Sequence, residues 1–276
     1  SGGPGSQYDS KATSGYKGEF QKYDNPNRKV DGLKPKDLVG IPWRLAFALQ
    51  ESGWYLRDAI IWAKAWIDEQ NNLEGSVMPE SQEDRCTKSY ETVFHLTKSR
   101  RYFFDIYAER TTSNATIRNV WRINTETFKG SHFATMPVRL AERCIRLGTS
   151  NHGVCRSCGT PFKRIVQKKD RPDVEQSDID RYGTGDAGVH RKIGGQYTKF
   201  LSDNPNVTVG WKQTCNCDAP DIEPAIVFDP FMGAGTTAVA AMKLGKRFLG
   251  FELNPAYAEI ARKRIRETQP GLAGFI

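Results

Sequence analysis

The hydrophobic positions towards the C-terminal end of the chain fall into short apolar runs separated by a stretch with helical spacing. The run 226–228 predicts a buried strand, 237–244 a helix packed on it, and 247–251 a second strand. A glycine-rich turn joins the first strand to the helix, where missing Cβ atoms would let a ligand approach the backbone. This order of elements predicts a parallel α/β unit.

The central part of the chain carries weaker versions of the same patterns. They predict a helix at 37–49, strands at 55–62, 90–96 and 102–105, and a helix at 138–147. Residues 1–36 have little apolar periodicity and are rich in Gly, Ser, Asn, Asp and Lys, so we expect a flexible segment there.

The composition of the chain indicates its size class and the charge of its partner. The 276 residues suffice for one large α/β domain with an insertion. The net charge of +8 and the pI of about 9.1 favour a polyanionic partner. The sequence contains no apolar run of membrane-spanning length and opens with no signal segment, so we expect no membrane partner and a cytoplasmic location.

Four of the six cysteines form two close pairs. Cys155 and Cys158 are followed by a glycine, as in a zinc knuckle, and Cys215 and Cys217 form a tighter second pair. Four thiolates suit a tetrahedral structural zinc ion. We therefore expect residues 151–222 to be a zinc-stapled insertion that forms part of a target-recognition region. A stabilising loop without DNA contact is the alternative.

Polar residues cluster where the two C-terminal strands are predicted to end. Asp229 follows the first strand, Gly233 and Gly235 lie in the turn, and Glu252 follows the second strand. The open N–H groups at the helix start favour an anion such as a carboxylate. A carboxylate at the end of the second strand can accept hydrogen bonds from two ribose hydroxyls. The spacing matches neither the Walker loop nor the dinucleotide fingerprint.

The whole string is more specific than its glycines. Asp229-Pro230-Phe231-x-Gly233-x-Gly235-Thr236-Thr237, with Gly250-Phe251-Glu252-Leu253-Asn254-Pro255 after it, resembles the S-adenosylmethionine (AdoMet) site of the DNA amino-methyltransferases. That family methylates N6 of adenine or N4 of cytosine, and the similarity is mainly to phage and restriction–modification enzymes. It implies a doubly wound, Rossmann-like α/β sheet formed by residues 37–150 and 223–276, in a bacterial or phage-infected cell.

The resemblance also implies which residues contact the cofactor. They are Asp229 in the turn, Phe231 at the adenosine, Gly233 and Gly235 at the methionine part, Thr236 or Thr237 at its carboxylate, Glu252 at the ribose, and His132 and Phe133 near the methionine end.

Double-stranded DNA is the partner that the resemblance implies. The candidate phosphate contacts are Arg85 and Lys88, in a loop similar to one beside the target-base pocket, and Arg118 and Arg122, in a basic stretch with aromatic residues. An ordinary solvated surface is the alternative for all four.

The catalytic string of the resembling family is Asp, Asn or Ser followed by Pro-Pro and an aromatic residue, and it does not occur here. The similar string at 254–257 follows Glu252 and is interpreted as a helix start. We expect the motif in an N-terminal block before residue 1 or in a second subunit.

The expected function is site-specific DNA methylation. A DNA-binding specificity or pseudoenzyme subunit that depends on a partner is the first alternative. A small-molecule or protein methyltransferase is the second, and the basic charge and the cysteine-bearing insertion argue against it.

Overall fold

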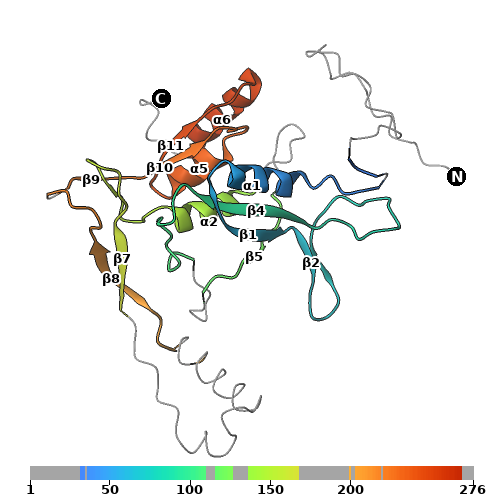
Figure 1. Cartoon of the computed structure of the whole chain (residues 1–276), viewed down its shortest axis with the longest axis horizontal. Coiled ribbons are helices and arrows are strands. Elements are labelled where there is room, and N and C mark those ends of the chain that lie inside the picture. The colour runs from blue at the N-terminus through green and yellow to red at the C-terminus, as the bar shows by residue number, and fades with distance from the viewer. Residues whose placement is uncertain are drawn as a thin grey trace, which may run out of the picture. The chain divides into compact units, whose positions relative to one another are not determined.

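The computed structural model describes residues 32–34, 36–109, 116–126, 136–167, 199, 203–218 and 220–268 (Figure 1). The chain divides into two compact units, Ser1–Phe47 and Ala48–Ile276. Helix α1 (Ile41–Glu51) begins in the first unit and ends in the second. Within the first unit, Arg44 Nε donates a hydrogen bond to the carbonyl oxygen of Val39 at 2.8 Å.

A three-stranded sheet in the second unit has the order β4-β1-β5. Strand β1 (Tyr55–Ala63) pairs antiparallel with β4 (Tyr90–Thr97) and parallel with β5 (Val120–Arg122). Apolar side chains on one face of β1 pack against helix α2 (Val138–Gly148), because alternate strand residues face the same side. The buried cluster consists of Ile60, Trp62, Trp121, Ile123, Leu140 and Leu147.

A second, parallel sheet pairs β10 (Ile226–Asp229) with β11 (Arg247–Gly250). Helix α5 (Thr236–Lys243) connects them, and α6 (Pro255–Thr268) follows. Helices α5 and α2 lie side by side (Figure 1). The fully buried Ala240 and Ala241 of α5 pack against α2, since small side chains let two helices approach closely.

Only one face of this second sheet is covered among the described residues. Val227 and Phe248 point into the cluster formed by α2 and α5. The residues on the other face are 51–60% exposed, and they are Ile226, Phe228, Leu249 and Phe251.

The described strands of the cysteine-bearing insertion form small antiparallel pairs. At its base β6 (Val154–Cys155) pairs with β9 (Ile222–Glu223). Beyond the base, β7 (Lys163–Gln167) and β8 (Val207–Lys212) form a two-stranded ribbon, seen as paired arrows in Figure 1. A separate hairpin joins β2 (Ala65–Ile67) to β3 (Leu73–Gly75).

The structure confirms most of the predicted elements to within a few residues, but the strand predicted at 102–105 is wrong. That segment pairs with no strand in the described part of the chain. The Asp105 N–H donates to the carbonyl oxygen of Leu147, and the rings of Tyr102 and Phe104 pack on His95. The aromatic residues that predicted a strand serve instead to pack this segment against another part of the fold.

The α/β class is confirmed, whereas a single doubly wound sheet is not formed by the described strands, which fall into separate sheets. None of the helices in the described ranges is both long and apolar enough to span a bilayer.

Candidate functional site

The turn between β10 and α5 is braced by the carboxylate of Asp229. Its Oδ1 accepts a hydrogen bond from the Phe231 N–H at 2.9 Å, and its Oδ2 accepts one from the Thr237 hydroxyl at 2.6 Å. The last residue of the strand therefore holds the start of the turn and the start of the helix together. The brace explains why an aspartate followed by a proline stands at this position: the side chain supplies the acceptor that the turn backbone needs.

Glu252 lies beside this turn because β10 and β11 are parallel and end at the same edge of their sheet. Its Oε2 accepts a hydrogen bond from the Gly233 N–H at 2.8 Å, and its Oε1 accepts one from the Asn254 N–H at 2.8 Å. Each carboxylate oxygen can accept a second hydrogen bond. Glu252 thus connects the turn to the segment between β11 and α6, and it keeps acceptor capacity for hydroxyl groups.

The two glycines of the turn serve different purposes. Gly233 has φ +53°, and a Cβ placed there would meet only the carbonyl oxygen of Phe231, at 3.9 Å. Gly235 has φ +80°, and a Cβ there would lie 2.9 Å from Cβ of Ala261 on α6. Open space at Gly233 suits a ligand that approaches the backbone, while Gly235 is required by helix packing.

Both threonine hydroxyls at the helix start are engaged within the chain. Thr237 donates to Asp229, and the buried Thr236 accepts a hydrogen bond from Nη1 of Arg264 at 3.1 Å. The same Nη1 donates to the carbonyl oxygen of Ala234 at 2.7 Å. Burial lowers the pKa of the Arg264 guanidinium, partly offset by the charge of Glu126.

Sequence reasoning assigned Arg264 no role at the turn. Its contact reaches back 28 to 30 residues, from α6 to the turn, and no local pattern reports it.

The remaining cofactor candidates divide into one exposed residue and two that the structure does not describe. Phe231 is 87% exposed, so the residues that the structure describes leave most of its ring uncovered. His132 and Phe133 lie outside the described residues.

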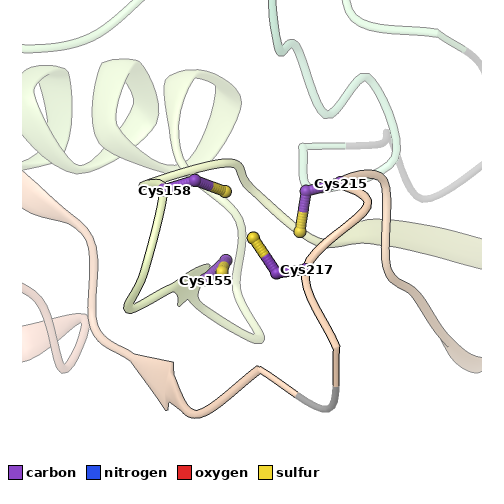
Figure 2. Close-up of side chains that lie close together, drawn as sticks. All are labelled: Cys155, Cys158, Cys215 and Cys217. Atoms are coloured by element: carbon purple, nitrogen blue, oxygen red, sulfur yellow. The ribbon is translucent and has the colours of Figure 1, made fainter.

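The structure brings the four cysteines of the insertion together. The Sγ atoms of Cys155, Cys158, Cys215 and Cys217 all lie within 4.8 Å of one another (Figure 2). Cys155 ends β6 and Cys158 lies in the turn after it, while Cys215 and Cys217 lie on the chain that follows β8 (Figure 2). Four thiolates at this separation match the donor set and size of a tetrahedral zinc site.

Neighbouring polar groups surround this cysteine cluster. Gln213 Nε2 donates to the carbonyl oxygen of Cys215 at 3.0 Å. The Thr160 hydroxyl, 3.2 Å from Cys158 Sγ, lowers the pKa of the Cys158 thiol to about 6. Hydrogen bonds with Cys158 and Cys155 raise the pKa of the Cys217 thiol to about 12. Thiols this close cannot all ionise unless a cation balances them, which is what a bound dication does.

The four basic candidates lie in the loop before β4, just before β5 and at the end of β5. They are Arg85, Lys88, Arg118 and Arg122, and all are exposed. Ala63, the last residue of β1, pairs with both Tyr90 and Arg122, so Arg122 and the loop before β4 flank the carboxyl end of β1. Arg85 forms an ion pair with Glu80 at 2.7 Å, which neutralises part of its charge.

Comparison with known proteins identifies the family. The model of the N6/N4 DNA methylase family matches residues 11–155 and 222–263, more than half of the chain. The type II methyltransferase M.Cfr9I of Citrobacter freundii is 33% identical over 91% of this chain and 60% of its own length. M.SmaI of Serratia marcescens is 32% identical over 90% of this chain and 59% of its own length. The chain thus spans about three fifths of the length of the curated relatives it matches.

Among solved structures, M1.HpyAVI is similar with 18% identity and a TM-score of 0.43, over 83% of this chain and 68% of that one. The PvuII cytosine-N4-specific DNA methyltransferase is similar with 14% identity and a TM-score of 0.41, over 86% of this chain and 60% of that one. The resemblance drawn from the turn motif is confirmed by the family match. The chain belongs to the N6/N4 family of DNA methylases.

Proposed function

We propose that this chain binds AdoMet at the β10–α5 turn and takes part in methylation of adenine N6 or cytosine N4 in specific sites of duplex DNA. The observation that carries this proposal is the turn itself. Glu252 and Asp229 brace it, while the backbone at Gly233 stays open to a ligand. Family membership supplies the reaction class.

Different residues of the turn would contact different parts of the cofactor. AdoMet supplies a methyl group that its sulfonium already activates. The protein's task is then to hold the two reactants in line, and positioning of this kind can contribute about 7–11 kcal/mol to lowering a barrier. Glu252 would accept hydrogen bonds from the ribose hydroxyls, the exposed Phe231 ring would contact the adenine, and Gly233 would admit the methionine part.

DNA would lie over the carboxyl ends of the strands. Ligands of open α/β sheets bind at this edge, and the turn and Glu252 lie there. Lys88 and Arg122 flank the carboxyl end of β1, and we propose that they hold backbone phosphates together with Arg85 and Arg118.

A further block of polypeptide would complete the sheet and supply the catalytic motif. The support is the apolar face of β10 and β11 that the described residues leave exposed, and the edge of β10 that pairs with no described strand. Burying about half of four large apolar side chains is a substantial driving force, since full burial of each contributes about 1.5–3 kcal/mol. A strand beside β10 with helices on this face would give the doubly wound sheet.

We also propose one structural zinc ion at the four-cysteine cluster. The support is the donor set and its spacing. Such an ion would hold the two ends of the insertion together and take no part in methyl transfer.

Tritium transfer from labelled AdoMet to duplex DNA tests the proposed reaction. The 276-residue chain, verified by mass, should bind AdoMet and transfer poorly alone, and addition of the block in cis or as a partner chain should raise transfer. Glu252→Ala should weaken AdoMet binding by about 1.5–3 kcal/mol in calorimetry, the scale of hydrogen bonds to a charged group. Unchanged affinity would contradict the ribose assignment. Strong transfer by the verified chain alone would contradict the need for a further block. DNA binding without transfer under any of these conditions would favour a specificity or pseudoenzyme subunit.

A further inference from the structure

The β7–β8 ribbon is fixed to the rest of the second unit through one of its two faces. Arg164 on β7 forms an ion pair with the buried Asp105 at 2.8 Å and donates to the Thr208 hydroxyl at 2.8 Å. Its guanidinium also lies 4.5 Å from the ring centroid of Trp211 on β8. The Trp211 ring in turn stacks on His152 at 5.5 Å. These contacts define the inner face of the ribbon and hold it in one orientation.

The pairing register places two lysines on the opposite, outer face. Lys163 stands directly opposite Lys212, one residue before the pair of Arg164 and Trp211. Successive strand residues point to opposite faces, so both lysines point away from Asp105. Both are exposed, and neither has a carboxylate within ion-pair distance among the residues that the structure describes.

Two ammonium groups at directly opposed positions repel each other in the free protein. An anion between them turns this repulsion into two attractions. Further along the outer face of the described ribbon come Ile165, 44% exposed, and the opposed pair Gln167 and Val207, of which Val207 is 56% exposed. Among the described residues of this face, the positive charge therefore lies at the end next to the cysteine cluster. The arrangement is a small, fixed and positively charged spot on an exposed ribbon.

We propose that Lys163 and Lys212 bind the phosphate backbone of the duplex DNA substrate, making the insertion a sequence-independent DNA contact. The inference rests on the proposed function, because it takes duplex DNA as the substrate. Lysine acts as a point charge towards phosphate and carries no base-reading geometry. The contact therefore contributes affinity and orientation rather than choice of sequence.

Charge compensation of the metal centre is the competing explanation for the lysine pair. Four thiolates around a divalent ion carry two net negative charges, and Lys163 and Lys212 lie at the neighbouring end of the ribbon. Removing the lysines would then weaken metal binding and leave DNA binding unchanged. The two explanations make opposite predictions for the same variant.

The test measures DNA binding of the full chain as a function of salt, with fluorescently labelled duplexes of several sequences. Neutralisation of each phosphate by one lysine contributes about −0.9 to the slope of log Kobs against log salt. In Lys163→Gln/Lys212→Gln the slope should become shallower by about 2, with the same loss of affinity on every duplex. Lys163→Arg/Lys212→Arg should restore both. An unchanged slope would overturn the proposal, as would a loss confined to one sequence.

The matched control is Arg262→Gln/Lys263→Gln on α6. It removes the same two charges, but there each cation already faces a carboxylate, Glu259 at 3.4 Å and Glu267 at 3.9 Å. Its slope should stay near that of the wild type, and an equal change in both variants would show an effect of net charge alone, which would overturn the proposal. Zinc content and AdoMet binding of each variant show whether the fold is intact. A wild-type chain that binds AdoMet but no DNA would contradict the proposed function itself.

Discussion

The cofactor turn and the cysteine-bearing insertion are held together by different kinds of interaction. Around the turn, β10, β11, α5 and α6 pack through buried small residues such as Ala240 and Ala241. In the insertion the described strands pair only two by two. The ribbon joins its surroundings through the ion pair of Arg164 with Asp105 and the stack of Trp211 on His152.

The difference predicts how each region responds to the loss of one group. Many small contacts share the stability of the cofactor turn, so a single change there should act locally. The insertion depends on a few polar clusters, and in such clusters the removal of one member leaves the others buried and unpaired. Single substitutions in the insertion should therefore have the larger effects.

Loss of a metal ligand should give the largest effect of all. Cys155 is fully buried and pairs with β9 at the base of the insertion. Cys155→Ser should abolish stoichiometric zinc, and since the binding energy of a structural zinc ion is folding energy, the insertion should unfold while the cofactor turn stays folded. Metal analysis measures the zinc content. Hydrogen exchange, followed separately in the insertion and around the cofactor turn, measures which of the two regions unfolds. Cys144→Ser, outside the cluster, should retain one zinc per chain. A Cys155→Ser variant that keeps its zinc, or one that loses hydrogen-exchange protection equally in both regions, would contradict the separation.

Breaking the ion pair that anchors the ribbon should have the next largest effect. The side chains of Asp105 and Arg164 are only 3% and 14% exposed. Asp105→Ala leaves the guanidinium buried without its partner and should cost about 3–5 kcal/mol of unfolding free energy. Asp105→Ala combined with Arg164→Met removes both charges and should recover much of that loss. Denaturant titrations of the single and double variants give the comparison. A double variant as unstable as the single one would show that packing, rather than charge, anchors the ribbon.

The two turn glycines allow a sharper test within the cofactor region. Gly235→Ala combines a strained left-handed alanine with a clash against Ala261, and should cost about 2–4 kcal/mol of stability. Gly233→Ala meets open space and should cost only the strain, about 1–2 kcal/mol. The affinity of the folded fraction for AdoMet should show the reverse order, with the larger loss in Gly233→Ala. Only the Cβ added at Gly233 would enter the space left for the ligand. Thermal unfolding and calorimetry on both variants measure the two orders.

The elements around the cofactor turn were predictable because their signals are local. The apolar run before Asp229 and the apolar run before Glu252 each report one strand, and the glycines between them report the turn. The four cysteines were predictable as a cluster because each pair is close in sequence. In both cases a few neighbouring residues carry the whole pattern.

The contacts that position these elements could not be predicted in the same way. Arg164 meets Asp105 across 59 residues, and Arg264 meets the turn across about 30. The segment at 102–105 shows how a local pattern can mislead. Its aromatic residues predicted a strand, but in the structure Tyr102 and Phe104 pack on His95. Side chains whose partners are distant in sequence leave no periodic signal.

The smallest expected effect lies where the two regions meet, at Lys246. Its Nζ donates to the carbonyl oxygen of Ser150 at 2.6 Å, just before the insertion begins, and burial lowers the pKa of this ammonium. Between the lowered pKa and the ordinary lysine pKa of about 10.4, the unfolded chain binds more protons than the folded one, so the unfolding free energy should rise with pH in that window. Lys246→Met removes the group, and in this variant that rise should be smaller.

At neutral pH the loss of the hydrogen bond and the relief of the buried charge oppose each other, so the net change should stay within about 1 kcal/mol. Urea titrations from pH 7 to 10.5, with Lys243→Met as the control on the more exposed side of α5, give the comparison. An equal rise in the Lys246→Met variant would show that other groups, and not the buried ammonium between the two regions, cause the dependence.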